Sequence, residues 1–136
     1  MDLKVVQSVM KNCELFEGVD QSQLGFLMLK GSAREFAEGE TVYRKGEKAG
    51  GTLALIVSGK VNVIAEDGYV LRELGVGEVM GEVGTISQQG TRTVSVTASQ
   101  PTQILQWHIR DIKEGSPELI KRLKDLAWKR IKNWYE

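Results

Sequence analysis

The pattern of apolar and polar positions predicts a helical start, a central stretch of short strands and a helical end. Four apolar residues at the spacing of one helix face predict an opening amphipathic helix: Leu3, Val6, Met10 and Cys13. Asp20, followed three residues later by Gln23, resembles a capping box for a second helix over 24–30. Gly31 is placed to end that helix. Cys13 is expected to be a small core residue and not a reactive thiol.

The central stretch changes to short extended runs separated by glycines. The predicted strands cover 41–43, 53–57, 61–65, 69–74, 93–99 and 103–108. Asp67-Gly68, between two of these runs, is a strong hairpin signal. Many short strands joined by regular turns predict a compact antiparallel roll, barrel or sandwich.

The last segment returns to helix, with Ser116 as N-cap and Pro117 at the first helical position. Its predicted apolar stripe contains Ile120, Leu123, Ala127, Ile131 and Trp134, widened by Leu119 and Leu126 on one side and by Trp128 and Tyr135 on the other. Two interpretations fit so wide an arc. The helix is sunk deeply into its own domain, or it contacts the roll, a partner helix and a ligand.

Length and charge set the class of protein. The 136 residues are enough for one domain with a real core, and the 18 basic residues balance the 18 acidic ones, which argues against bulk nucleic-acid binding. Cys13 is the single cysteine, so no internal disulfide can form. The chain shows no signal peptide and no apolar stretch long enough for a membrane span. A cytoplasmic protein without a membrane partner is expected.

Catalytic chemistry has little support in the sequence. His108 is the single histidine, so neither a histidine-built metal site nor a nucleophilic triad is predicted. The phosphate-loop pattern of nucleotide triphosphatases is also absent from the sequence. We therefore expect no enzyme, no catalytic residues, no metal and no cofactor.

The stretch 81–98 carries the candidate binding chemistry. Gly81-Glu82-Val83-Gly84 predicts a short helical turn whose free N–H groups favour an anion. Arg92, at the head of a strand, adds a planar fork suited to phosphate oxygens, and Thr93 adds a hydroxyl. Glu82 needs a hydrogen-bond donor such as a sugar hydroxyl. A phosphate and a hydroxyl on one small ligand point to a nucleotide.

Residues 15–131 resemble the cyclic nucleotide-binding domain, the β-roll shared by catabolite-activator-type regulators, kinase regulatory subunits and nucleotide-gated channels. The matching segments, in order, are Leu15-Phe16, 36–40, 58–61, 77–82 and 91–98. The last two resemble the phosphate-binding cassette of that family. The resemblance implies a mainly β fold with flanking helices: an antiparallel double-stranded β-helix, or jelly-roll-like β-roll, over 32–108, after a helical lead-in over 1–31 and before C-terminal helices over 109–136, all in one domain.

The resemblance also implies roles for individual residues. Arg92 would pair with the exocyclic phosphate oxygens, Glu82 would accept from the ribose 2′-hydroxyl, and Thr93 would contact phosphate or purine. Gly81, Val83 and Gly84 would supply backbone N–H groups or close approach. Trp134 and Tyr135, near the end of a lid helix, would stack on the base. The alternative, slightly favoured for Trp134, is that it simply continues the apolar stripe.

The expected function is a stand-alone sensor that binds cyclic AMP, slightly favoured, or cyclic GMP and signals through its C-terminal helix. No DNA-binding module fits in the residues that remain after the roll. Two alternatives stay open at this point. One is a nucleotide-free roll that forms a homodimer or binds a partner protein through the C-terminal helix. The other is a sensor of a different anionic effector.

Overall fold

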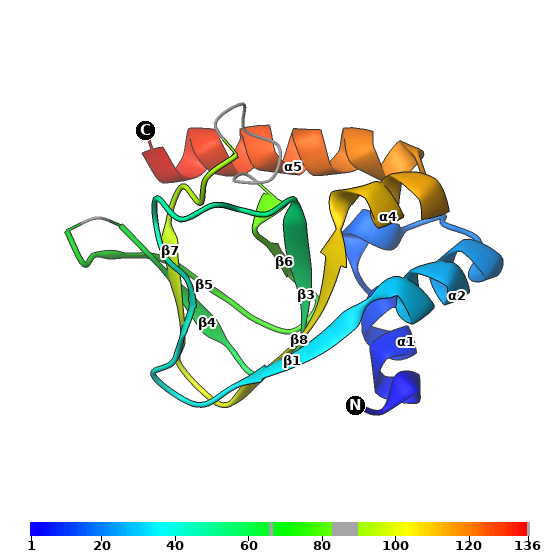
Figure 1. Ribbon diagram of the computed structural model, residues 1–136, viewed down its shortest axis with the longest axis horizontal. Helices are drawn as coiled ribbons and strands as arrows, with labels where there is room; N and C mark the ends of the chain where they lie inside the picture. Colours follow the sequence, from blue (N-terminus) through cyan, green and yellow to red (C-terminus); the bar gives the residue numbers. More distant parts are fainter. Residues whose placement is uncertain (66, 83–89, 136) are drawn as a thin grey trace.

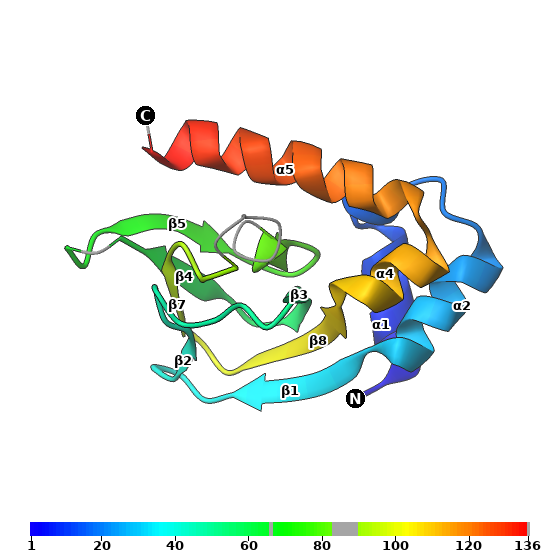
Figure 2. The ribbon, with the colours of Figure 1, turned by 45° about the horizontal axis from the view of Figure 1, so that its top comes forward.

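The computed structural model describes residues 1–65, 67–82 and 90–135, with side chains described as far as residue 132. Its elements are α1 (Leu3–Lys11), the 3-10 helix η1 (Glu14–Phe16), α2 (Gln21–Lys30), β1 (Ser32–Phe36), β2 (Thr41–Tyr43), β3 (Thr52–Ser58), β4 (Val61–Ile64), β5 (Val70–Leu74), β6 (Val79–Met80), β7 (Ser95–Ala98), β8 (Thr102–His108), α4 (Ile109–Gly115) and α5 (Glu118–Tyr135). The strands form a roll, helices α1, α2 and α4 gather at one end of it, and α5 lies along one side (Figures 1 and 2).

Both N-terminal helices begin at aspartate caps. The Asp2 carboxylate accepts a hydrogen bond from the Lys4 N–H, and the Asp20 carboxylate accepts one from the Gln23 N–H, each at 2.9 Å. These bonds satisfy N–H groups that have no partner inside the helix. The predicted cap at Asp20 is therefore confirmed. Hydrogen bonding to Gln23 also lowers the pKa of the Asp20 carboxyl.

The buried face of α1 begins one turn later than the pattern predicts. Val6 and Met10 are buried, whereas Leu3 is exposed at the start of the helix. Cys13 lies beyond α1, just before η1, and is buried in the core, where burial raises the pKa of its thiol. Gly31 ends α2 in extended backbone, where a Cβ would lie 2.6 Å from the Leu105 side chain.

In the described residues the roll consists of two four-stranded sheets, with strand orders β1-β8-β3-β6 and β2-β7-β4-β5, and their pairings are antiparallel. The predicted β-roll with flanking helices is confirmed. The hairpin expected at Asp67-Gly68 joins β4 and β5, with Gly68 at a φ of 88°. Neither β1 nor β6 is among the strands predicted by residue range. β6 pairs with β3 through Val79 and Met80, and it leads directly to Gly81.

β3 separates two hydrophobic clusters. Leu53, Leu55 and Val57 face the helices, together with Phe16, Leu27 and Trp107. The alternate residues Ala54 and Ile56 face the inside of the roll, together with Tyr43, Val63 and Val96. Burial on both faces explains why 53–57 is continuously apolar. The Trp107 indole N–H donates to the Leu27 carbonyl at 2.6 Å and so ties α2 to β8.

The buried face of α5 differs from the predicted stripe. Leu119, Leu123, Ala127 and Arg130 are buried, whereas Trp128 is 72% exposed and Ile131 is 36% exposed. The exposure of these two residues contradicts a helix sunk deeply into its own domain, and Arg130 takes a buried place on the same face as Leu123 and Ala127. At the other end of the helix, Arg122 donates to the carbonyls of Leu15 and Glu17 near η1. No helix among the described residues is long and apolar enough to cross a membrane.

Candidate functional site

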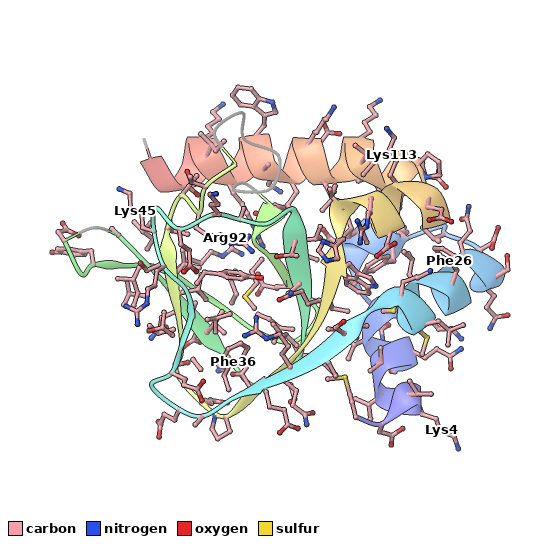
Figure 3. The ribbon with its side chains drawn as sticks, in the orientation of Figure 1. Lys4, Phe26, Phe36, Lys45, Arg92 and Lys113 are labelled. Carbon is pink, nitrogen blue, oxygen red and sulfur yellow. The ribbon has the colours of Figure 1, made fainter. Side chains whose placement is uncertain are left out.

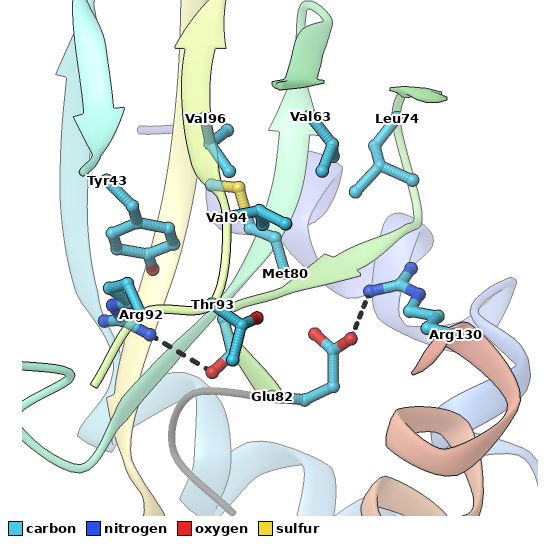
Figure 4. Close-up of a pocket in the computed structure, with 11 residues that line it drawn as sticks. Tyr43, Val63, Leu74, Met80, Glu82, Arg92, Thr93, Val94, Val96 and Arg130 are labelled. Carbon is cyan, nitrogen blue, oxygen red and sulfur yellow. Dashed lines mark hydrogen bonds and ion pairs between the residues drawn. The ribbon is translucent and has the colours of Figure 1, made fainter. Parts of the chain in front are cut away.

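A small cavity lies inside the roll, where β6 ends and β7 begins (Figure 4). Arg92, in its wall, lies inside the roll beneath α5 (Figure 3). The apolar wall of the cavity is formed by Val63, Leu74, Met80, Val94 and Val96, and its polar wall by Tyr43, Gly81, Glu82, Arg92, Thr93 and Arg130. The free space among these side chains is about 20 Å³, which is room for about one water molecule. The site is therefore closed in this conformation.

Gly81 makes room for the polar wall. Its backbone has a φ of +87°, a left-handed conformation that favours glycine. A Cβ at this position would lie 2.7 Å from Nη1 of Arg92 and 3.2 Å from the Tyr43 ring. Both the backbone angle and the space therefore require a glycine here.

Arg92 is held in the cavity wall by hydrogen bonds to the chain itself. Nη1 donates to the carbonyls of Thr52 at 3.0 Å and Gly81 at 3.1 Å. Nη2 donates to the Ala49 carbonyl at 3.0 Å and to Thr52 Oγ1 at 2.8 Å. The Tyr43 ring stacks on the guanidinium, with 3.7 Å between Cζ and the ring centroid. Arg92 is 5% exposed, and burial lowers the pKa of its guanidinium. These bonds use the four terminal N–H donors of the side chain.

Glu82 forms an ion pair with the C-terminal helix. Its Oε1 atom lies 2.7 Å from Nη1 of Arg130, and both side chains are buried. Arg130 also donates to the Val79 carbonyl and lies 4.0 Å from the Glu78 carboxylate. One arginine of α5 thus contacts both the end of β6 and the candidate acceptor for a sugar hydroxyl. Figure 4 shows the two side chains pointing toward each other, joined by a dashed line.

Three buried polar atoms have no hydrogen-bond partner among the described residues. They are Tyr43 Oη, Glu82 Oε2 and Arg92 Nε, and all three residues line the cavity. Buried polar atoms without partners are rare in folded proteins, so a cluster of them indicates a place for a ligand. Glu82 Oε2 needs a donor and Arg92 Nε needs an acceptor. A molecule with a hydroxyl and an anionic oxygen satisfies both.

The structure brings Gly81, Glu82, Arg92 and Thr93 together at this cavity, although ten positions separate the glutamate from the arginine. Val83 and Gly84 lie outside the described residues, as do the side chains of Trp134 and Tyr135. The ligand contacts expected of all these residues stay predictions. No group of His, Cys, Asp and Glu in the described parts of the chain is arranged to hold a metal ion.

Tyr43 and Arg130 were not predicted from the sequence as residues of the site. Tyr43 reads as an ordinary aromatic residue of a strand. In the sequence, Arg130 resembles the other basic residues of a charged helix. It follows Leu123 by seven residues, however, and this spacing places both residues on one helix face. An arginine on the buried face of an amphipathic helix is the signal that could have found it.

The sequence profile of the cyclic nucleotide-binding domain matches residues 33–114. The chain belongs to the cyclic nucleotide-binding domain family. This confirms the resemblance seen in the sequence. The matched range contains both Glu82 and Arg92, and it ends at the end of α4, before α5.

Two known proteins are similar to this chain over most of its length. The CRP-like cAMP-activated global transcriptional regulator of Mycobacterium tuberculosis is 30% identical over 129 residues, which cover 87% of this chain and 57% of that protein. The catabolite activator protein of Thermus thermophilus has a TM-score of 0.72 and 25% identity, covering 87% of this chain and 58% of that one.

The regulatory subunit of a cAMP-independent protein kinase A from Trypanosoma brucei has a TM-score of 0.84 and 22% identity. The match covers 97% of this chain and 48% of that one, and it shows a shared fold. The chain therefore spans about half the length of these relatives of the cyclic nucleotide-binding domain family.

Proposed function

We propose that this chain is a regulatory domain, not an enzyme, that binds a 3′,5′-cyclic nucleotide in the cytoplasm and signals through α5. The main support is the ion pair between Glu82 and Arg130, because it connects the candidate ligand site to α5, the helix that is expected to move. Arg92 would bind the cyclic phosphate and Glu82 the ribose 2′-hydroxyl. Thr93 and the backbone of Gly81, Val83 and Gly84 would complete the contacts.

Binding requires the cavity to open, because a nucleotide does not fit in about 20 Å³. Arg130 reaches from α5 to both Val79 and Glu82, so release of α5 is the motion that would open the site. A ligand hydroxyl on Glu82 would change how strongly the glutamate holds Arg130. The ligand then contacts the open and closed states differently, which is what a shift between two states needs.

The phosphate would bind Nε of Arg92 directly, since this atom has no partner among the described residues, but bonds to the terminal nitrogens would have to replace protein groups. The four Nη donors are bonded to Ala49, Thr52 and Gly81 in the closed state. Exchanging three neutral carbonyls and one hydroxyl for phosphate oxygens would pair the guanidinium with an opposite charge, in the bidentate geometry that arginine and phosphate favour. We call the groups of Ala49, Thr52 and Gly81 that accept from Arg92 the closed cage. The bound phosphate and the closed cage therefore compete for the same guanidinium.

We favour cyclic AMP over cyclic GMP, supported by the mycobacterial relative, whose name describes it as cAMP-activated. The trypanosomal structure, described as cAMP-independent, has the same fold, so the ligand must be tested directly. The experiment is calorimetry and thermal unfolding of the full chain with cyclic AMP, cyclic GMP and, as a control, linear 5′-AMP.

A cyclic nucleotide should raise the melting temperature, since a ligand bound by the native state stabilises it. The variants Glu82→Gln and Arg92→Lys should bind more weakly, and Arg92→Lys keeps a positive charge in the cage. The proposal fails if neither cyclic nucleotide produces heat or a thermal shift in the wild-type protein.

A second function is favoured by the exposed surface of α5. Trp128 and Ile131 present apolar side chains to solvent on this helix, which fits a partner protein or a second copy of the chain. Sedimentation of the wild type and Ile131→Glu tests it. A dimer that is lost in the variant, together with no response to nucleotide, would favour an interaction module without a nucleotide.

A further inference from the structure

The Tyr43 side chain carries a buried hydroxyl that makes no hydrogen bond to the described residues of the fold. The residue belongs to β2, is 4% exposed, and its ring packs in the apolar cluster inside the roll. The ring also covers the guanidinium of Arg92. A phenylalanine would make the same apolar and cation–π contacts. The hydroxyl is the part that these contacts leave unexplained.

The hydroxyl lies at the cavity beside the anion-binding group. A Cβ on Gly81 would be 3.3 Å from Tyr43 Oη and 2.7 Å from Arg92 Nη1, so both atoms border the same space above Gly81. Tyr43 Oη has no hydrogen-bond partner among the described residues. Leaving a buried hydroxyl unpaired is unfavourable, so the group calls for an explanation, and a bound ligand that supplies the missing partner is one.

We propose that the Tyr43 hydroxyl is a ligand contact that donates a hydrogen bond to the anionic end of the bound molecule. It would act with Arg92 on the phosphate, while Glu82 holds the sugar hydroxyl. Tyr43 thus adds a fourth polar side chain to those of Glu82, Arg92 and Thr93, contributed by a strand far in sequence from the stretch 81–98. The assignment of the anion to a cyclic phosphate rests on the proposed function.

The surroundings fit a neutral donor. Burial raises the pKa of the Tyr43 phenol, with the charge of Arg92 acting in the opposite direction, so the hydroxyl keeps its proton at neutral pH. A protonated phenol donates one hydrogen bond and suits an oxygen that carries negative charge. The nearby Arg92 guanidinium attracts the same oxygen, so the two groups favour one ligand position.

The test compares Tyr43→Phe with Tyr69→Phe, a matched change at a tyrosine that is 74% exposed. Each full-length variant is titrated with cyclic AMP, cyclic GMP and inorganic phosphate, and its unfolding is measured without ligand. Tyr43→Phe should bind the nucleotide about tenfold more weakly, the effect of one hydrogen bond to a charged group. Its melting temperature without ligand should equal or exceed that of the wild type, because the unpaired hydroxyl is gone. Tyr69→Phe should change neither quantity.

The outcomes separate this inference from the proposed function. Unchanged nucleotide affinity in Tyr43→Phe would overturn the inference and leave the function standing. A clear loss of stability without ligand would also overturn it, because the hydroxyl would then have a partner in the protein. If the wild type responds to phosphate but to neither nucleotide, and Tyr43→Phe weakens that response, the inference stands and the function fails. No response to any of the three probes overturns both.

Discussion

Arg130 and Glu82 are 48 residues apart in the sequence, yet Nη1 of the arginine lies 2.7 Å from Oε1 of the glutamate. Both side chains are almost fully shielded from water, with 7% and 2% of their side-chain surface exposed. A charge in such a place is stable only with a partner. Each residue therefore depends on the other, and the position of α5 depends on both.

Replacing the arginine should expose this dependence. Arg130→Met leaves the Glu82 carboxylate buried without its partner, which should lower the free energy of unfolding by about 3–5 kcal/mol. The double variant Glu82→Gln/Arg130→Met should recover part of this loss. Denaturant unfolding measures both, with the exposed Lys124→Met as the control for loss of a cation on α5. Equal stability of Arg130→Met and Lys124→Met would mean that the ion pair contributes nothing.

Alanine variants of two glycines with the same backbone angle distinguish the cost of backbone strain from the cost of a steric clash. Gly77 and Gly81 both have a φ of +87°, but a Cβ on Gly77 would have nothing within 4 Å. Gly77→Ala should therefore lose about 1–2 kcal/mol from backbone strain alone. Gly81→Ala should lose more and should also lose its response to nucleotide, because the new Cβ displaces Arg92. Unfolding and calorimetry of the two variants check this, and similar results for both would argue against the collision.

Thr52 is predicted to compete with the ligand for Arg92. Thr52→Val removes the hydroxyl that accepts from Nη2 at 2.8 Å. The free protein should lose about 1.5–3 kcal/mol of stability, the range for hydrogen bonds to charged groups, while nucleotide affinity rises because the closed cage is weaker. Thr97→Val, on β7, is the control. A lower affinity in Thr52→Val would show that the hydroxyl serves the bound ligand instead.

Trp134 is still predicted to stack on the purine. Trp134→Ala should weaken nucleotide binding by about 1–3 kcal/mol, the range for stacking of a base on an aromatic ring. Trp128→Ala removes a mostly exposed indole of the same helix and should leave the affinity unchanged. Titration followed by tryptophan fluorescence compares the two. Equal affinities would assign Trp134 to the apolar surface of α5.

Most of the fold could be predicted because its signals are local. Glycines mark the turns, alternating or continuous apolar runs mark the strands, and Asp20 marks the start of α2. β6 could not be predicted because two residues, Val79 and Met80, are too few to show a pattern. The buried position of Arg130 was also missed, since Ile131 and Trp128 are more apolar than Arg130, and the partners that hold the arginine inside, Glu82 and the Val79 carbonyl, are distant in sequence.

Part of the candidate site could be predicted because two of its residues lie close together in the sequence. Glu82 and Arg92 lie in one short stretch with a characteristic order of residues, so their proximity could be inferred. Tyr43 and Arg130 reach the cavity from distant elements, and their roles depend on which way each side chain points. The closed cage around Arg92 depends on carbonyl groups of Ala49, Thr52 and Gly81, and backbone carbonyls leave no mark in a sequence.

The two arginines of α5 hold the helix at two separate places, so under the proposed function one end could move while the other stays fixed. Arg122 fastens one part of it to the carbonyls of Leu15 and Glu17, and Arg130 fastens the other part to the cavity. Under the proposed function, release of the second contact with the first one kept would let the helix pivot about its packed N-terminal part near residue 122. At about 1.5 Å per residue, the end of the helix at Tyr135 is about 20 Å from that pivot, so a rotation of about 20° moves it by about 7 Å. A change of one hydrogen-bond partner inside the roll would thus become a displacement large enough for another protein to detect.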